Sequence, residues 1–408
     1  LLLPILFMIS AISRTTPCPA DEGMCLFNAL PTETLKSKYD FTPTEEWTRH
    51  VMLSSVRFNS GGSASFVSGQ GLVLTNHHVA LDTLHKLSTS EHNYAEDGFL
   101  AASFEEEIPA PDLELNQLVS IEDVTDRVNA EVTDEMSSDE AFRARRAIMS
   151  QIEKESLEKT GLRSDVVTLY GGAEYHLYRY KKYTDVRMVW APETKAAFFG
   201  GDADNFEYPR YCLDVALMRV YEDDKPAKIE HFLKYSDSGA DEGELIFVSG
   251  NPGRTQRILT AAALEHLRDK RFPRALNVLR RLEILYQQYS YEGPEQKRRV
   301  RDELFGVQNS RKAYGGMLQG LQNPSFLASK RLEEANRLKE LEADPKLKKY
   351  VDAGKTIEDL QERKAEMLKY SWALAYHSKH YSIAETLVLM AAEDQKPSKE
   401  RLREYRDS

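Results

Sequence analysis

Short apolar runs of strand length occur in two parts of the chain. Residues 63–67 and 72–75 are rich in small, β-branched and apolar side chains, and the Gly-Gln-Gly sequence at 69–71 between them has the composition of a hairpin turn. Four later runs are bounded by clusters of Gly, Pro or Asp, at residues 166–170, 185–190, 214–221 and 245–248. The pattern predicts a β domain that is interrupted after its first hairpin.

Helical spacing of apolar residues prevails in the other stretches. Residues 31–58 form an amphipathic lead-in, and the charged stretch at about 81–162 is predicted to be a mostly helical insertion into the β domain. Beyond Gly250 an apolar stripe follows one helix face, at Leu276, Leu279, Leu282, Leu285, Tyr286 and Tyr289. Residues 251–408 are therefore predicted to form an α-helical domain, with their basic clusters on solvated helix faces.

The first residues of the chain resemble a secretory signal. Residues 1–12 are almost wholly apolar, and Arg14, Pro17 and Ala20 follow them, as in an h-region with a small-residue cleavage site. We expect residues 1–20 to be a signal peptide whose true start is missing, because an initiating Met and a basic n-region are absent. The protein is then expected to be periplasmic or extracellular. A buried amino-terminal helix is the alternative.

Length and charge narrow the class of partner. The 408 residues are enough for two or three compact domains. The net charge of -11 provides no general basic field for phosphate backbones, so nucleic acid is not an expected partner. No stretch after the signal is expected to span a membrane.

The cysteines and histidines show no metal-binding pattern. Cys18, Cys25 and Cys212 have no regular spacing, and neither a CxxC pair nor an HExxH motif occurs. We therefore predict no metal site. A disulfide between Cys25 and Cys212 stays open.

A histidine pair follows the first predicted hairpin directly, in the sequence Thr75-Asn76-His77-His78-Val79. In chymotrypsin-like peptidases the general base lies at the end of such a strand, in a Thr-x-x-His pattern, which here selects His78. That base needs a serine hydroxyl at one ring nitrogen and a carboxylate at the other. His77 is expected to point away. A surface or packing role for the pair is the alternative.

A second stretch, residues 200–214, carries several acidic residues and runs into a predicted strand at Asp214. The Asp202-x-Asp204 spacing is also found in calcium loops, but Phe206 stands where such a loop needs another oxygen ligand. We interpret Asp202 and Asp204 as turn residues. For Asp214 taken alone, the alternative is an aspartate that caps a turn.

Together the two stretches resemble the bacterial dipeptidyl-peptidase seven and eleven family, and the resemblance spans nearly the whole chain. In that family the base lies in a Thr-Asn-His-His motif and the orienting aspartate follows a Gly-Gly-Asp-x-Asp-Asn segment, which match His78 and Asp214. The implied fold is α+β: a chymotrypsin-like β barrel over residues 21–250, incomplete because its carboxy-terminal half is missing, with the helical insertion and the following helical domain.

The resemblance implies a secreted serine exopeptidase that releases dipeptides from the free amino terminus of peptides, through a His-Asp-Ser triad and an acyl-enzyme, without a cofactor. It also implies a homodimer. Ser249 lacks the Gly-Asn-Ser-Gly surroundings of an oxyanion hole, and Ser63 and Ser65 precede the histidine. The nucleophilic serine is therefore expected beyond residue 408, and residues 1–408 alone are expected to be inactive. Thr255 is expected to cap the first helix of the helical domain.

The family also holds the substrate ammonium with polar and aromatic groups. By resemblance these are Glu207 and Tyr208, at positions where relatives have an amide or apolar residue and a tryptophan, together with Asn309 from the helical domain. A carboxylate and a phenol still suit an ammonium. A solvent-facing helix residue is the alternative for Asn309.

Two other classes of protein remain open. One is a trypsin-like endopeptidase of the heat-shock type, which also carries a Thr-Asn-x-His-Val stretch, although the predicted helical domain argues against it. The other is a non-catalytic peptide-binding homologue. A Gly-Asn-Ser-Gly-Ser sequence beyond residue 408 would favour the enzyme.

Overall fold

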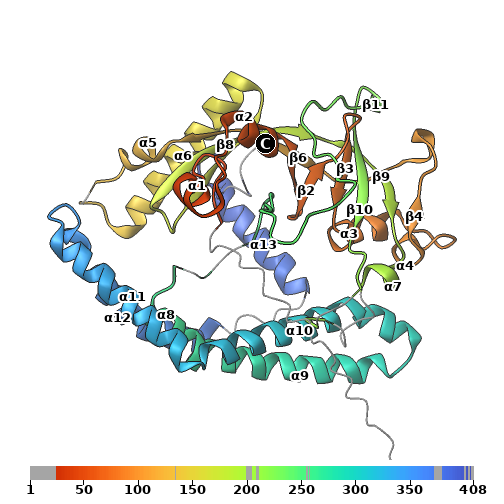
Figure 1. The fold of residues 1–408 in the computed structure, drawn as a ribbon. Helices are drawn as coiled ribbons and strands as arrows, with labels where there is room; N and C mark the ends of the chain where they lie inside the picture. The colour runs from red at the N-terminus through yellow and green to blue at the C-terminus, as the bar shows by residue number, and fades with distance from the viewer. Residues whose placement is uncertain are drawn as a thin grey trace, which may run out of the picture.

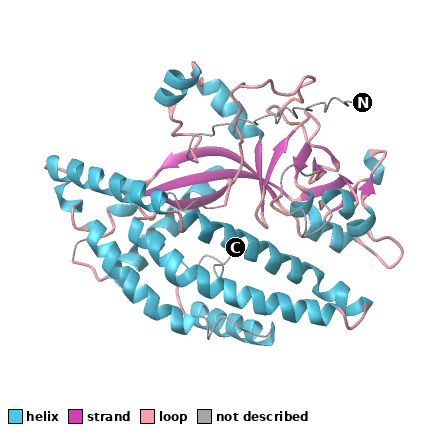
Figure 2. Cartoon of the chain, turned by 60° about the horizontal axis from the view of Figure 1, so that its bottom comes forward, coloured by secondary structure: helices cyan, strands magenta, loops and turns pink. Residues whose placement is uncertain are grey.

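The computed structural model describes residues 24–133, 135–198, 205–207, 211–253, 256, 258–371, 379–398, 401, 402 and 405. A twisted antiparallel sheet forms one layer, and long helices from the second half of the chain form another layer below it (Figures 1 and 2). The predicted signal peptide at 1–20 lies outside the described residues.

The sheet contains eleven antiparallel strands, nine of them in the order β4-β9-β10-β3-β2-β1-β6-β8-β7, with β5 beside β9 and β11 beside β10. Their bounds are β1 Ser55–Phe58, β2 Ser63–Phe66, β3 Leu72–Thr75, β4 Phe99–Leu100, β5 Ile108–Pro109, β6 Leu115–Asp123, β7 Arg163–Leu169, β8 Glu174–Tyr183, β9 Asp185–Ala191, β10 Ala216–Glu222 and β11 Lys225–Pro226.

The sheet is not closed into a barrel within the described residues. Closure would require its two end strands, β4 and β7, to pair, and they do not. The predicted strand at 245–248 is also absent, because no other described strand pairs with it. The fold is therefore mixed α/β with an open antiparallel sheet, and the predicted chymotrypsin-like barrel is not seen.

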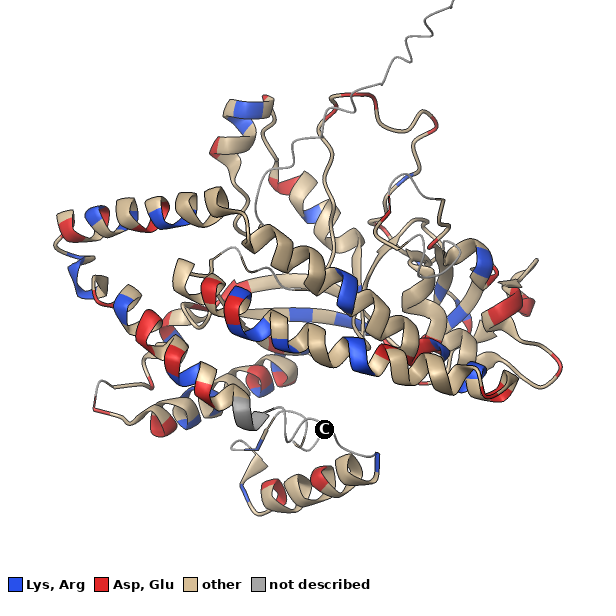
Figure 3. Ribbon diagram, turned by 90° about the horizontal axis from the view of Figure 1, so that it is seen from below, with Lys and Arg blue, Asp and Glu red and all other residues tan. Residues whose placement is uncertain are grey.

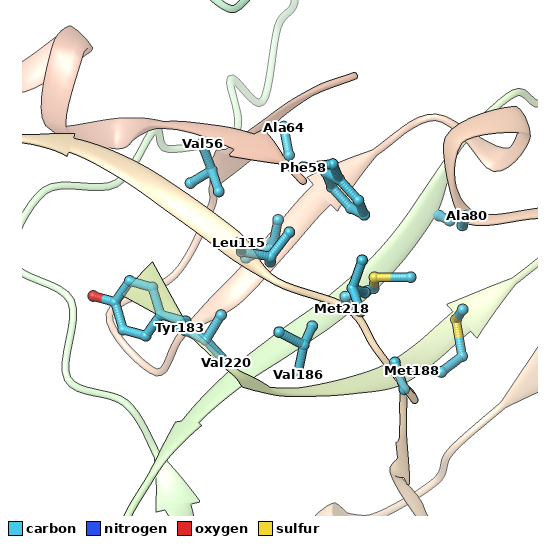
Figure 4. Close-up of a cluster of buried hydrophobic side chains, with 14 of the residues drawn as sticks. Val56, Phe58, Ala64, Ala80, Leu115, Tyr183, Val186, Met188, Met218 and Val220 are labelled. Atoms are coloured by element: carbon cyan, nitrogen blue, oxygen red, sulfur yellow. The ribbon is translucent and has the colours of Figure 1, made fainter. Parts of the chain in front are cut away.

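The main core lies along the central strands. In β2 and β3 every second residue is buried, which places Phe66 and Val73 on the core face. They pack with fully buried residues of neighbouring strands, among them Val56, Phe58, Leu115, Met188 and Met218 (Figure 4). Each such side chain contributes about 1.5–3 kcal/mol by leaving water, so this core fixes the register of the sheet.

The prediction of a mostly helical insertion at about 81–162 was only partly correct. Helix α6 is long and has a Ser137–Glu140 capping box, but β4, β5 and β6 also lie in this range. β6 pairs with β1 on one side and β8 on the other. Long-range pairing made this charged stretch a central strand, and local composition did not show it.

The helices extend through both halves of the chain. Their bounds are α1 Thr32–Tyr39, α2 Glu45–Ser54, α3 His77–Leu87, α4 Tyr94–Asp97, α5 Thr125–Asn129, α6 Ser138–Thr160, α7 Thr194–Ala197, α8 Ala261–His266, α9 Phe272–Ser290, α10 Pro294–Leu321, α11 Pro324–Ala343, α12 Ala353–Ser371 and α13 Lys379–Asp394. From Ala261 onward every described regular element is helical, and a π-helical turn joins α8 to α9.

Helix packing in the second half follows the predicted stripe in part. α9 and α10 lie side by side (Figure 1), and the stripe is half-buried except for exposed Leu285. Leu264, Phe272 and Leu321 are in a separate buried cluster. The side chain of Thr260 caps α8, whereas Thr255, predicted for this role, lies outside the described residues.

Charged side chains lie on the long helices (Figure 3), and the two described cysteines are not bonded to each other. Lys, Arg, Asp and Glu are interspersed along the long helices (Figure 3). No described helix is long and apolar enough to cross a membrane. Cys25 and Cys212 are both free thiols, so the disulfide that the sequence left undecided is not formed.

Candidate active site

The two histidines lie where a strand passes into a helix. β3 ends at Thr75, Asn76 has extended backbone angles, and α3 begins at His77. His78 is therefore in the first turn of α3 and not on the strand itself. The first backbone N–H groups of a helix have no partner within it, so they are available to an acceptor from elsewhere.

Asp214 supplies that acceptor. The backbone N–H of His78 donates to Asp214 Oδ1 at 3.0 Å, and His78 Nδ1 lies 2.7 Å from Asp214 Oδ2. The side chain of Asn76 donates to the backbone carbonyl of Asp214 at 3.0 Å and to its Oδ2 at 3.3 Å. Asp214 thus caps α3 and orients the imidazole with the same carboxylate.

Sheet register brings these residues together across 136 positions of sequence. β10 pairs antiparallel with β3, and Ala216 lies opposite Thr75. Asp214 lies two residues before Ala216 and His78 lies three residues after Thr75, so both stand just beyond the paired ends of the two strands and come close together. Val79, in the first turn of α3, packs closely against Gly62. A Cβ at position 62 would lie 2.8 Å from Val79 Cγ1, so this close approach requires glycine.

The pair is electrostatically coupled. The hydrogen bond to Asp214 raises the pKa of His78 above its usual range, against a smaller effect of burial. Burial alone would raise the pKa of Asp214, but the ring and backbone hydrogen bonds from His78 together hold it below its usual range. The His78 side chain is 64% exposed and that of Asp214 29%, so the pair is open to solvent on the His78 side. Because Nδ1 of His78 is bonded to Asp214, Nε2 is the ring nitrogen left to accept a proton from a hydroxyl group.

His77 has a different environment. It is 2% exposed, and its buried Nε2 has no hydrogen-bond partner among the described residues. Burial lowers the pKa of His77 more than the nearby Asp214 carboxylate raises it. A neutral, buried imidazole is a packing group, and it cannot exchange protons with a substrate in solvent.

The second part of the candidate site joins the loop before Asp214 to α10. Asn205 is 5% exposed, and its Nδ2 donates to Asn309 Oδ1 at 2.9 Å. The loop is tied at its base, since the Leu213 backbone N–H donates to the Ala196 carbonyl at 2.9 Å. Phe198 and Phe305 stack edge to face at 4.2 Å between the same loop and helix. Asn309 is therefore half-buried and paired, not solvent-facing.

The other predicted ammonium contacts are not placed beside Asn309 by any described contact. Glu207 is exposed, and Tyr208, Asp202 and Asp204 lie outside the described residues. The sequence analysis did not single out Asn205, although it lies in the acidic stretch at 200–214. The feature that could have revealed it is its amide side chain, because an amide in a buried position must form a hydrogen bond. No group of three or more His, Cys, Asp or Glu that could hold a metal occurs in the described part of the chain.

A comparison with protein families identifies the family of the chain. The model of the family Peptidase S46 matches residues 20–408. The chain belongs to this family, whose members are serine peptidases.

Relatives of the chain are named dipeptidyl-peptidases. The Asp/Glu-specific dipeptidyl-peptidase of Shewanella putrefaciens is 30% identical over 356 residues, which are 83% of this chain and 48% of that protein. Dipeptidyl-peptidase 7 of Capnocytophaga gingivalis is 36% identical over 213 residues, 50% of this chain and 30% of that protein. The matched residues therefore cover less than half the length of each of these relatives.

A solved structure has a similar fold. Porphyromonas endodontalis DPP11, crystallised in complex with a dipeptide of arginine and aspartate, matches with a TM-score of 0.66 and 26% identity. The match covers 78% of this chain and 49% of that one. The open sheet and helical layer thus belong to a fold that a dipeptidyl-peptidase also adopts.

Proposed function

We propose that the whole protein is a serine dipeptidyl-peptidase that uses His78 as general base and Asp214 as the orienting carboxylate. The observation that supports it most is the double contact of Asp214 with the ring and backbone of His78. A carboxylate on Nδ1 fixes the tautomer whose Nε2 accepts a proton, and it stabilises the imidazolium that forms.

The proposed reaction is acyl transfer. A serine hydroxyl attacks the carbonyl carbon of the second substrate residue while its proton passes to His78 Nε2. The imidazolium returns that proton to the leaving amine, which leaves a dipeptidyl ester on the serine. Water, deprotonated by His78, then hydrolyses the ester. We propose that the serine lies in polypeptide beyond residue 408, as the greater length of the relatives supports.

Exopeptidase character requires a site for the substrate ammonium. We assign it to Asn309 together with Asn205, because their side-chain amides meet at 2.9 Å beside the loop that leads to Asp214. The amide oxygens are acceptors that a charged amine prefers. That Glu207 and Tyr208 also hold the ammonium stays a prediction; the Glu207 side chain is exposed, and Tyr208 lies outside the described residues.

Three further features belong to this proposal. Residues 1–20 act as an export signal, the sheet is completed to a chymotrypsin-like double barrel by polypeptide beyond residue 408, and the protein forms a homodimer. Peptides are the substrates, and the reaction as written needs no cofactor.

The test is activity of the gene's full-length product on a dipeptidyl fluorogenic substrate, beside residues 1–408 alone. We expect turnover that a serine-directed phosphonate abolishes in the full-length protein, and none above background in residues 1–408. Turnover of residues 1–408 would place the nucleophile within them. An inactive full-length protein that still binds peptides would support the non-catalytic homologue, and cleavage at internal bonds would support the endopeptidase.

A further inference from the structure

Lys312 lies three residues after Asn309, on the same face of α10. Its Nζ atom donates to the backbone carbonyl of Asn205 at 3.5 Å, a long hydrogen bond that the charge of the donor strengthens. The side-chain amide of Asn205 donates to Asn309 Oδ1 at 2.9 Å. Side chains three and four positions apart are neighbours on a helix surface. One turn of α10 therefore contacts both the main chain and the side chain of Asn205.

The two contacts fix different parts of Asn205. The hydrogen bond to Asn309 holds the end of the side chain, but it does not fix the main chain that carries this side chain. The ammonium group of Lys312 attracts the carbonyl oxygen and so holds the main chain. Because the nitrogen of the Asn205 amide is used by Asn309, the amide oxygen is the atom left to accept from a substrate amine. The position of that oxygen depends on both contacts.

The packing of α10 brings Lys312 to this loop. Arg311 forms an ion pair with Glu283 of α9, with Nε 2.6 Å from Oε2, and their side chains are 29% and 14% exposed. Phe305, two helical turns before Lys312, stacks edge to face on Phe198 at 4.2 Å. These contacts set the rotation of α10 about its own axis. Lys312 is thus held toward the loop before any substrate binds, as a preorganised binding site requires.

We propose that Lys312 is a positioning residue for the substrate ammonium, because it holds the main chain of Asn205 so that the amide oxygen meets the free amine. This inference rests on the proposed function, in which Asn205 and Asn309 bind that amine. Lys312 acts through Asn205 and does not itself bind the amine. A lysine ammonium has no acceptor atom, and two ammonium groups repel each other.

Steady-state kinetics of the full-length protein test the role. Lys312→Met should raise KM for a free dipeptidyl substrate about tenfold and change kcat less than about twofold, because a lost binding contact affects ground and transition states alike. KM for the acetylated substrate should change less than about twofold. Lys312→Arg should restore KM, and Lys297→Met is the matched control, since Lys297 is exposed on the same helix. An unchanged KM, or a lower KM through lost repulsion of the amine, would overturn the proposal.

A double variant tests whether Lys312 acts through Asn205. In Asn205→Ala there is no amide left to position, so the further change Lys312→Met should alter KM for the free substrate less than about twofold. The same change in the wild-type background should raise KM about tenfold. A full tenfold effect in both backgrounds would show that Lys312 acts on the substrate by another route, and the positioning role would fail.

Hydrogen exchange separates this proposal from the proposed function, because it needs no turnover. In the full-length protein the amides of residues 205–207 should exchange at least about threefold faster in Lys312→Met and at the wild-type rate in Lys297→Met. Unchanged exchange in Lys312→Met, in a protein that cleaves dipeptides, would overturn the positioning role and leave the proposed function standing. Faster exchange in a protein without dipeptidyl-peptidase activity would overturn both the proposed function and the ammonium role, and would leave Lys312 a structural support of the loop.

Discussion

Arg219 and Glu107, 112 positions apart in sequence, form an ion pair in the interior of the protein, with Nε 2.9 Å from Oε1. Their side chains are 10% and 3% exposed. The hydroxyl of Tyr221 donates to the same carboxylate at 2.7 Å, and Arg219 Nη1 donates to the Gln70 carbonyl at 2.8 Å. The pair therefore ties β10, which follows Asp214, to the hairpin turn that precedes the histidines.

Removal of one partner of this pair should destabilise the protein strongly. Glu107→Gln leaves the Arg219 charge buried without a counter-ion, a change that costs about 3–5 kcal/mol in comparable sites. Urea denaturation followed by circular dichroism measures it. Glu295→Gln is the control, because its pairs with Arg298 and Arg299 are exposed and should matter little. Equal denaturation midpoints for the two variants would show that the Arg219–Glu107 pair is not stabilising.

The two histidines should respond oppositely to mutation in the full-length enzyme. His78→Ala removes the proposed base and should lower kcat by about 10⁴-fold or more, with a smaller loss of stability than His77→Ala because the His78 side chain is 64% exposed. His77→Ala leaves a cavity at a buried position and should lower stability by about 1–3 kcal/mol while kcat changes far less. Stopped assays at 25 °C and a melting curve for each variant separate the two effects. A larger kcat loss for His77→Ala would reverse the assignment.

Activity should follow the protonation of His78. The base works only as a neutral imidazole, and its pKa is raised by Asp214, so kcat/KM should reach half of its maximum above about pH 6.5. Asp214→Asn removes the acceptor, so this limb should move to lower pH while kcat falls about 10³- to 10⁴-fold. A pH–rate profile of each enzyme is the measurement. An unchanged limb in Asp214→Asn would mean that another group titrates.

The same pair predicts the pH dependence of stability. Because the pKa of His78 is raised in the folded protein, the stabilisation that its protonated form adds to the fold is complete below about pH 6.5. That stabilisation is lost as pH rises through the folded-state pKa. Because the pKa of Asp214 is lowered in the folded protein, the stabilisation that its carboxylate adds to the fold is present above about pH 4 and is lost as pH falls through the folded-state pKa. The Tm difference between wild type and Asp214→Asn should therefore be largest near about pH 5. A difference that grows toward pH 8 would contradict the pairing.

Substrate selection should depend on the free amine. Acetylation of the substrate amine removes charge-assisted contacts worth roughly 1.5–3 kcal/mol each, so kcat/KM should fall at least about a hundredfold. Asn309→Ala and Asn205→Ala should each reduce kcat/KM on free substrates but change it little on acetylated ones, because the contact is already lost there. Full additivity of mutation and acetylation would exclude these amides from ammonium binding.

Local sequence patterns predicted several elements correctly. The hairpin at β2 and β3 follows from two apolar runs around a Gly-rich turn, and Gly71 has a φ of 70° there. Pro294 and Pro324 stand at the first positions of α10 and α11, where proline is favoured because its missing N–H has no partner to lose there. These features depend on neighbouring residues, whose backbone preferences act within a few positions.

Tertiary structure decided the features that depend on distant residues. β6 became a strand because β1 and β8 pair with it, whereas residues 245–248 have strand composition and no described partner. The motif predicted that His78 and Asp214 belong together, but only the register of β3 against β10 set their 2.7 Å contact. Asn205 was overlooked because its meeting with Asn309 requires the helical layer to lie against the loop. Sequence encodes local preference, and burial and pairing between remote segments select among the structures it allows.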